Sequence, residues 1–334
     1  MNIPRTLKLA FCLALASTVL AAGCGRGRGR ALEVGYVSAP QVNLRDRVAA
    51  VYNKVAVVKN GDRVEVLDRD RRFVKVRTSG GAEGWMEQRY LVNQQVYDRL
   101  QKLQQDHQND PVQGQATTRN DTNLHVEPGR DSDHLYQIGV GEKVALLKRS
   151  MAEKPGTVVP APRATAKPDE KKEAKPVVED WWLVRDVHGR VGWILGRMVD
   201  LDVPLEIAQY AEGQRIVAYF VLDEVHDADK KVPQYLTLLT EPKDGLPFDF
   251  NQVRVFTWNV KRHRYETAYR ERLKGIVPVV VGQEDFGEKE GTLPVFTVRV
   301  QDDAGNATER KYKLNSPIVR RVVAPGAEAG KKGK

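Results

Sequence analysis

Hydrophobic and polar residues alternate along much of the chain, mostly with the two-residue period of β-strands. In the C-terminal part, turn-forming residues such as Asp244-Gly245 and the run 302–306 separate the alternating segments. The predicted strands there are residues 215–225, 234–239, 253–260, 264–271, 276–281, 295–300 and 308–314. We therefore expect residues 204–323 to form one antiparallel β domain, which we assign to no known family.

Two earlier segments share a series of landmarks in the same order. These are an Asn-Leu pair, a turn glycine followed by an alternating strand, a Val-Arg pair and a Gly-Trp pair. They occur first at Asn43-Leu44, Gly61, Val76-Arg77 and Gly84-Trp85, and again at Asn123-Leu124, Gly141, Val184-Arg185 and Gly192-Trp193. The common order and spacing predict two copies of one small β fold, at residues 34–93 and 121–203.

The segment between the two copies has a different period. Val96, Leu100 and Leu103 recur at helical spacing, which predicts a short amphipathic helix in residues 94–108. Residues 94–120 are interpreted as a linker made of this helix and a polar stretch. We expect the helix to dock on the first copy.

The second copy contains an insertion at residues 151–179 that is rich in Pro, Ala, Lys and Glu. Such a composition buries little apolar surface. We therefore predict an extended, mobile loop within a hairpin, acting as a spacer. The alternative is a polyproline strand that a partner recognises.

The amino end has the pattern of an export signal. Arg5 and Lys8 precede a charge-free apolar stretch at residues 9–22, and Gly23-Cys24 follows it. This stretch is shorter than the roughly 20 residues of a membrane span and is typical of a secretory signal. The Ala-Ala-Gly-Cys ending resembles the lipid-attachment box of bacterial lipoproteins. The resemblance implies that residues 1–23 are removed and that Cys24 becomes an acylated membrane anchor, whereas an ordinary signal peptide would leave a free thiol.

Charge and cysteine content agree with an exported chain. The other cysteine, Cys12, lies in the predicted signal, so the mature chain holds no pair for a disulfide. Part of the formal net charge of +9 lies in a Gly/Arg-rich tether at residues 24–33 and a basic, disordered tail at 324–334. We expect a membrane partner through Cys24, no nucleic acid, and a lipid-anchored location in the cell envelope, at the outer membrane and facing the periplasm.

Motifs of catalysis and metal binding are missing from the sequence. The six histidines show no metal-ligand spacing, and neither a Gly-x-Ser-x-Gly motif nor a phosphate loop occurs. The acidic run from Asp223 to Asp229 is interpreted as a solvated turn in preference to a cation site. We therefore expect no cofactor, no metal and no enzymatic activity, and an enzyme would have to use the carboxylates of that run.

The landmarks of the two copies resemble those of the bacterial SH3-like domain family, small β-barrels found on exported proteins. The second copy also has the expected Pro turn, Glu127-Pro128-Gly129, and the aromatic pair Trp181-Trp182. The first copy lacks this turn and has Phe73-Val74 in place of the pair. The resemblance implies a mainly β protein with two SH3-like barrels, a C-terminal antiparallel β domain and one short linker helix.

The same resemblance implies a non-catalytic envelope lipoprotein whose SH3-like domains bind peptidoglycan peptide or glycan. Aromatic rings can stack on sugars and peptides, and arginines suit an anionic polymer. The expected ligand-binding residues are therefore Phe73, Arg77, Trp85, Trp182, Arg185 and Trp193. The alternative function is an adaptor for another envelope protein.

The tryptophans also allow a purely structural interpretation. A small barrel has little core, so one large ring supplies much of it, and Trp85 and Trp193 suit that role. Trp181 and Trp182 are adjacent and point to opposite faces of a strand. We therefore expect one of these two rings to be exposed.

Overall fold

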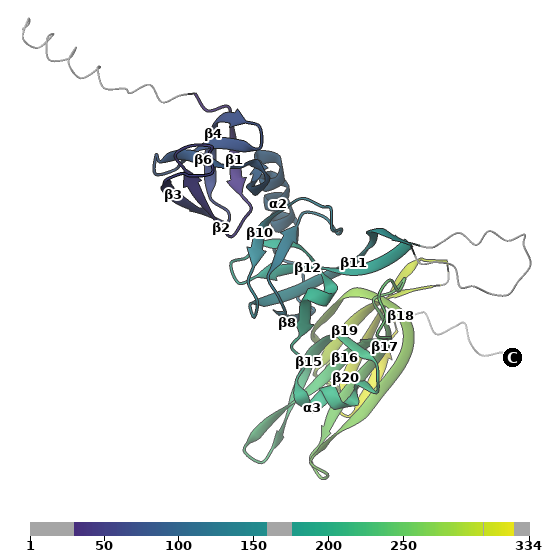
Figure 1. Cartoon of the computed structure of the whole chain (residues 1–334). Helices are drawn as coiled ribbons and strands as arrows, with labels where there is room; N and C mark the ends of the chain where they lie inside the picture. Colours follow the sequence, from purple (N-terminus) through teal and green to yellow (C-terminus); the bar gives the residue numbers. More distant parts are fainter. Residues whose placement is uncertain (1–29, 159–175, 303, 324–334) are drawn as a thin grey trace, which may run out of the picture. The chain divides into compact units, whose positions relative to one another are not determined.

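The computed structural model describes residues 30–158, 176–302 and 304–323 (Figure 1). Cys24, the predicted signal and the basic tail lie outside the described residues. The chain is mainly β, as predicted, and forms three antiparallel sheets of seven strands each. The strands belong to two compact units: of the described residues, those up to Leu91, apart from 38–40, form the first, and the others form the second.

The first sheet has the strand order β3-β2-β6-β5-β4-β1-β7. Its inward positions carry apolar residues such as Leu44, Val66, Val76 and Met86, all of which are buried. Polar residues alternate with them, which is why these segments form strands with one face in a core. The strands are β1 (Glu33–Val37), β2 (Gln41–Arg45), β3 (Lys54–Lys59), β4 (Arg63–Asp70), β5 (Phe73–Thr78), β6 (Glu83–Glu87) and β7 (Leu91–Asn93).

The second sheet repeats this topology strand by strand, in the order β10-β9-β13-β12-β11-β8-β14. In each sheet a single 3-10 turn, Gln88–Tyr90 or Gly196–Met198, precedes the last strand. The strands are β8 (Gly114–Thr118), β9 (Thr122–His125), β10 (His134–Ile138), β11 (Lys143–Val158), β12 (Pro176–Asp186), β13 (Val191–Leu195) and β14 (Val199–Leu201).

The Gly-Trp landmark has the same physical cause in both sheets. A Cβ on Gly84 would lie 2.8 Å from the Cβ of Leu44, and one on Gly192 would lie 2.7 Å from the Cβ of Leu124. Real Cβ atoms do not approach so closely, so only glycine lets β2 cross β6, and β9 cross β13, at this separation.

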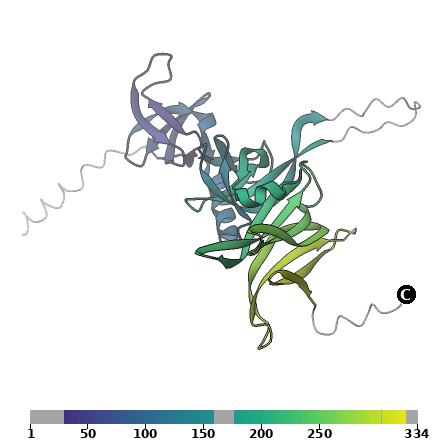
Figure 2. The same cartoon turned by 90° about the horizontal axis from the view of Figure 1, so that it is seen from below.

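The predicted insertion is partly a regular hairpin. β11 continues to Val158 and β12 begins at Pro176, and the register pairs Met151 with Asp180 and Glu153 with Val178. Figure 2 shows these two strands extending beyond the rest of their sheet. The prediction of a loop was therefore wrong for residues 151–158 and 176–179, and residues 159–175 lie outside the described part.

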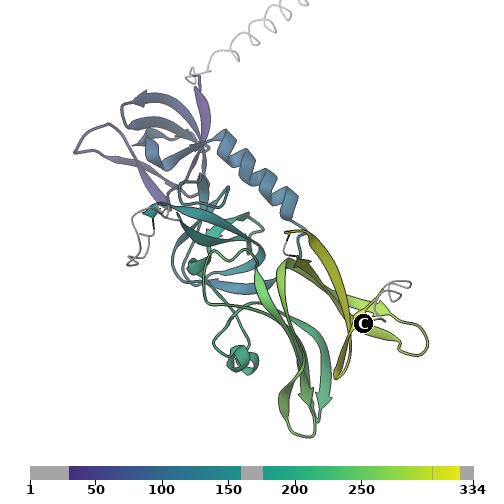
Figure 3. The same ribbon diagram turned by 90° about the vertical axis from the view of Figure 1, so that its right-hand side faces the viewer.

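Helix α2 (Gln94–His107) forms where the sequence predicted it. The side chain of Asn93 caps its first turn by accepting a hydrogen bond from the backbone N–H of Val96 at 3.1 Å. Leu103 packs against Trp181, Trp193 and other apolar residues of the second sheet. Figure 3 shows the helix as a blue coiled ribbon. The expected docking on the first copy is thus corrected: the helix belongs to the second unit.

The third sheet is a meander in which each strand pairs with the next. The two strands predicted at residues 264–271 and 276–281 are one long strand, and a last, short strand was not predicted because it lacks clear alternation. The strands are β15 (Arg215–Asp227), β16 (Lys230–Thr240), β17 (Phe250–Asn259), β18 (Arg264–Asp285), β19 (Thr292–Gln301), β20 (Ala307–Asn315) and β21 (Ile318–Val322).

The second and third sheets share one hydrophobic core. Leu146 and Trp182 of the second sheet belong to the same buried cluster as Phe250 and Phe296 of the third. The short helix α3 (Leu205–Ala208) connects the two sheets in the chain. No helix among the described residues has the length and apolar character needed to cross a bilayer.

Candidate functional site

Three of the six predicted ligand-binding residues come together on one face of the first sheet. In β5, Val74 and Val76 are fully buried on the inner face, so Phe73 and Arg77 occupy the opposite face. Trp85 lies on that face in β6, directly opposite Lys75 of β5. We call this surface the outer face of the first sheet; it consists of Arg45, Phe73, Lys75, Arg77, Glu83 and Trp85.

Cations and rings alternate across this outer face. Trp85 is half-buried and has Lys75 on one neighbouring strand and Arg45 on the other. The Arg45 guanidinium carbon lies 4.2 Å from the centre of the Tyr52 ring and 5.4 Å from that of Phe73. These are cation–π distances, which explains how Phe73 is buried although it points away from the core.

Arg77 is occupied by two carboxylates of the protein itself. Its Nη2 donates to Glu83 at 2.8 Å, and its Nη1 donates to Glu65 at 3.3 Å. Hydrogen bonds from Arg77, and then from Lys75, lower the pKa of Glu83, so this carboxylate stays ionised and keeps Arg77 paired. Among the described residues of this face, Arg45 is the cation without a carboxylate partner. The prediction omitted it, although it directly follows the Asn43-Leu44 pair.

The strand register identifies the corresponding residues of the second sheet. Leu183 faces Trp193 as Lys75 faces Trp85, which makes Trp181 the counterpart of Phe73. This face is apolar and lies under helix α2, and Trp181 and Trp193 are only 2% and 8% exposed. The face that is half-open in the first copy is thus covered in the second.

The other two predicted residues of the second sheet also have partners within the protein. Trp182 points to the inner side and packs in the core shared with the third sheet. The prediction that Trp181 or Trp182 would be exposed was therefore wrong, because the helix covers one ring and the third sheet covers the other. Arg185 donates to the backbone carbonyl of Gln108, just beyond helix α2.

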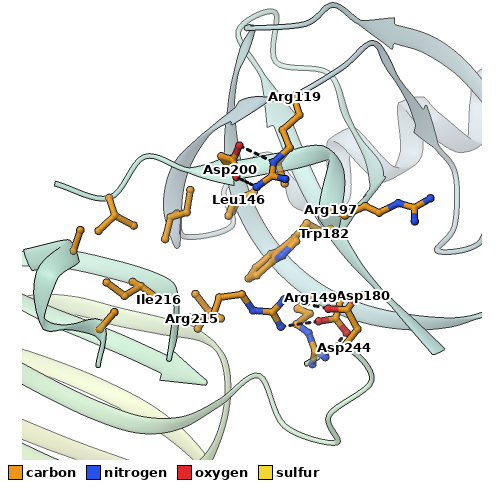
Figure 4. Close-up of a pocket in the computed structure, with 17 residues that line it drawn as sticks. Arg119, Leu146, Arg149, Asp180, Trp182, Arg197, Asp200, Arg215, Ile216 and Asp244 are labelled. Atoms are coloured by element: carbon orange, nitrogen blue, oxygen red, sulfur yellow. Dashed lines mark hydrogen bonds and ion pairs between the residues drawn. The ribbon is translucent and has the colours of Figure 1, made fainter. Parts of the chain in front are cut away.

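A pocket of about 500 Å³ lies between the second and third sheets (Figure 4). Trp182 and Ile216 contribute to its apolar surface. Its four arginines each lie near a carboxylate: Arg119 pairs with Asp200, Arg149 and Arg215 pair with Asp180, and Arg197 lies 3.9 Å from Glu179. Three of these guanidinium groups are thus engaged at ordinary ion-pair distances, and Arg197 is the most loosely held cation of the described lining.

Arg149 forms the centre of a buried ion network beside this pocket. Its guanidinium lies 2.5 Å from Asp180 and 2.9 Å from Asp249, and the three side chains are 5%, 6% and 7% exposed. Burial disfavours the charged form of Arg149, but its two carboxylate partners outweigh this and raise its pKa. Asp180 belongs to the second sheet and Asp249 precedes β17, so the network joins the two sheets.

Asp227, the last residue of β15 and part of the acidic run, has structural partners. Asp227 accepts hydrogen bonds from Trp258 Nε1 and His263 Nδ1, both at 2.7 Å, which tie together two hairpin ends of the third sheet. These hydrogen bonds, the one from Trp258 first, lower the pKa of Asp227. Among the described residues, no group of three metal-ligating side chains is placed to hold an ion.

Comparisons with known proteins support the first copy most directly. The family model of the bacterial SH3 domain matches residues 40–92, which contain the whole outer face of the first sheet. A search of curated proteins found no match. The comparison therefore supports a bacterial SH3 domain at residues 40–92.

Solved structures similar to the chain include an NlpC/P60 family protein from Bacillus cereus, with 9% identity and a TM-score of 0.24 over 85% of this chain and 95% of that one. NlpC2 from Trichomonas vaginalis has 10% identity and a TM-score of 0.18, over 87% of this chain and 95% of that one. NlpC1 from the same organism has 9% identity and a TM-score of 0.17, over 83% and 87%. Scores this low carry no argument about fold or activity.

Proposed function

We propose that this protein is a non-catalytic lipoprotein of the cell envelope whose first SH3 domain binds cell-wall peptide or glycan. The bacterial SH3 domain at residues 40–92 supports a cell-wall-associated role. The observation that carries the proposal is the position of Trp85, half-buried on the outer face of the first sheet between Arg45 and Lys75.

The chemistry of the outer face suits a peptide or sugar ligand with carboxylates. A half-open indole gives a flat apolar surface for the ring of a sugar or the side of a peptide. Arg45 beside it offers charge-assisted hydrogen bonds, which are stronger than neutral ones and favour a carboxylate.

In this proposal the second copy is also an SH3-like domain, but it has a structural role. Its strand order is that of the first sheet, and helix α2 covers the face that corresponds to the ligand face. Trp182, Arg185 and Trp193 then stabilise the second unit. In the first unit, Phe73 is buried beneath Arg45 and supports it, and ligand binding depends on Trp85 and Arg45.

The proposed location depends on Cys24. After removal of residues 1–23, an acylated Cys24 would hold the domains at the outer membrane, on its periplasmic side. The mass of the intact protein from the membrane fraction tests this step directly. A mature chain that begins at an unmodified Cys24 would show the anchor to be wrong without bearing on the wall-binding face.

Co-sedimentation with purified peptidoglycan tests the ligand-binding site. The chain from Gly25 onward contains every described residue, and we expect it to sediment with sacculi. Trp85→Ala should lower sedimentation about tenfold, because it removes the stacking ring, which is worth about 1–2 kcal/mol.

Trp258→Ala is the matched control, since it removes a half-buried tryptophan from the third sheet. It should sediment as the wild type does, and near-ultraviolet circular dichroism should show that both variants are folded. Wild-type sedimentation by a folded Trp85→Ala variant would refute the assignment of the face.

A further inference from the structure

The loop between β2 and β3 carries an unusual group of exposed apolar residues. Residues 46–55 are all exposed, and they include the uninterrupted run Val48-Ala49-Ala50-Val51-Tyr52. Val51 is 85% exposed, and Val48 and Tyr52 are 37% and 36% exposed. Runs of several exposed apolar residues are disfavoured on soluble domains unless they contact something. We call residues 48–52 the apolar loop.

Hydrogen bonds between Asp46 and Asn53 hold the two ends of the apolar loop together. The backbone N–H of Asp46 donates to the carbonyl of Asn53 at 3.0 Å, and the N–H of Asn53 returns a bond to the Asp46 carboxylate at 2.9 Å. Hydrogen bonds from Arg47, and then from Asn53, lower the pKa of Asp46 to about 2. The Asp46 carboxylate therefore stays ionised at physiological pH and keeps the two ends of the loop together. Arg45 lies against the Tyr52 ring and holds the end of the loop.

The second copy provides an internal control for this loop. Its loop between β9 and β10 closes in the same way, through the N–H of Val126 and the carbonyl of Asp133 at 2.9 Å. The residues inside that loop are Glu127-Pro128-Gly129-Arg130-Asp131-Ser132, all polar or turn-forming. The same fold thus builds the same loop without apolar residues, so folding alone does not explain those of the first copy.

The charges beside the apolar loop are mostly positive. Arg45, Arg47, Lys54 and Lys59 precede or follow it, against the single carboxylate of Asp46 in the segment 41–59. An apolar tip with a tyrosine and basic neighbours has the composition of segments that enter the interface of anionic membranes.

We propose that the apolar loop inserts into the head-group region of an anionic membrane. The inference rests on the envelope location given above for the nearness of the membrane. A protein partner fits less well, because a tip of only five residues falls far short of the roughly 800 Å² per partner of a stable interface. Interfacial insertion needs only a few apolar side chains together with basic neighbours.

Vesicle sedimentation tests this contact without the lipid anchor. The chain from Gly25 onward should bind vesicles that contain phosphatidylglycerol and should bind phosphatidylcholine vesicles less well. The double variant Val48→Asp, Val51→Asp should lower the partition coefficient about tenfold or more, because it replaces two inserted methyl pairs by charges that anionic lipid repels. Its sedimentation with sacculi should not change, which separates this test from that of the wall-binding face.

Val187→Asp is the matched control, since Val187 is a 68% exposed valine in the turn after β12. This variant should partition as the wild type does. Equal partitioning of wild type and double variant would overturn the proposal. If crosslinking in membranes captured a protein partner with the wild type but not with the double variant, while vesicle binding stayed unchanged, the loop would be a protein interface and the proposal would be overturned.

A second measurement uses the full, anchored chain. Once residues 1–23 are removed and Cys24 is acylated, a cysteine introduced at Val51 is the single reactive thiol. A nitroxide at Val51→Cys should be relaxed by an agent dissolved in the lipid phase, whereas one at Asp131→Cys, an exposed position in the polar loop of the second copy, should not. Equal relaxation at the two positions would also overturn the proposal.

Discussion

The buried Arg149 network gives the sharpest quantitative prediction. Replacing Arg149 by Met keeps much of the side-chain volume but removes the cation between Asp180 and Asp249. Breaking a buried ion pair by removing one partner costs about 3–5 kcal/mol, because the other charge stays buried without compensation. An exposed ion pair would cost no more than about 1 kcal/mol.

The remaining contacts place the expected loss in the lower part of that range. Asp180 keeps an ion pair with Arg215 at 3.2 Å and a hydrogen bond from the N–H of Gly245 at 3.0 Å. Asp249 keeps only the hydrogen bond from the N–H of Val277, at 2.8 Å. We therefore expect Arg149→Met to lower the free energy of unfolding of the second unit by about 3 kcal/mol.

Urea unfolding followed by tryptophan fluorescence measures this loss. The chain has five tryptophans, and in a Trp85→Phe background the remaining ones, at positions 181, 182, 193 and 258, all lie in the second unit. The signal then reports that unit alone. The loss should shrink as the pH falls, because burial already raises the pKa of Asp249 and the unpaired carboxyl would take up a proton in the folded state.

Asp249→Asn in the Arg149→Met background separates charge from packing. An asparagine still accepts the hydrogen bond of Val277 but carries no buried charge, so about 1–2 kcal/mol should return. A single variant within about 1 kcal/mol of the wild type, or a double variant no more stable than the single one, would refute the buried-charge reasoning.

Three further predictions concern the two copies. Trp193→Ala should destabilise the second unit by about 3–5 kcal/mol, because it leaves a cavity under helix α2, whereas the half-open Trp85→Ala should cost the first unit clearly less; equal losses in urea unfolding would contradict the contrast between the faces. Gly84→Ala should cost the first unit about 1–3 kcal/mol through the clash with Leu44, and an unchanged melting temperature would mean that β2 and β6 separate easily. Burial lowers the pKa of His125, so the contribution of neutral His125 to the free energy of unfolding should be complete above the unfolded pKa of about 6.5 and be lost as the pH falls toward the pKa of the folded state. His125→Gln should make the melting temperature less dependent on pH. A melting temperature that depends on pH as strongly as in the wild type would exclude His125 as the source.

Local patterns were sufficient to predict the strands and the repeat. Alternation and turn residues depend on neighbours in sequence, so the strands of the third sheet and helix α2 appear close to where they were expected. The break predicted between residues 271 and 276 was wrong because the long strand β18 passes through it with only a shift in its register against β17. A shift of this kind leaves no turn signal in the sequence.

The position of helix α2 was less accessible, although the sequence held a signal for it. Lys75, Glu83 and Glu87 of the first copy correspond to Leu183, Val191 and Leu195 of the second. A change from polar to apolar at three outward positions indicates a covered face, and comparing the copies position by position would have found it. The partners of Arg149 gave no such signal, because Asp180 and Asp249 lie 31 and 100 residues further along the chain.

The sealing of one duplicated face by a helix of the same chain also limits valence. A ligand made of many identical units, such as a polymer, can be gripped at two points only by a chain with two open sites, and avidity then slows its release. Of the two copies described here, one has its outer face closed. Each molecule should therefore bind such a polymer at a single site and dissociate at the rate of that one contact. Firm attachment would require several molecules side by side.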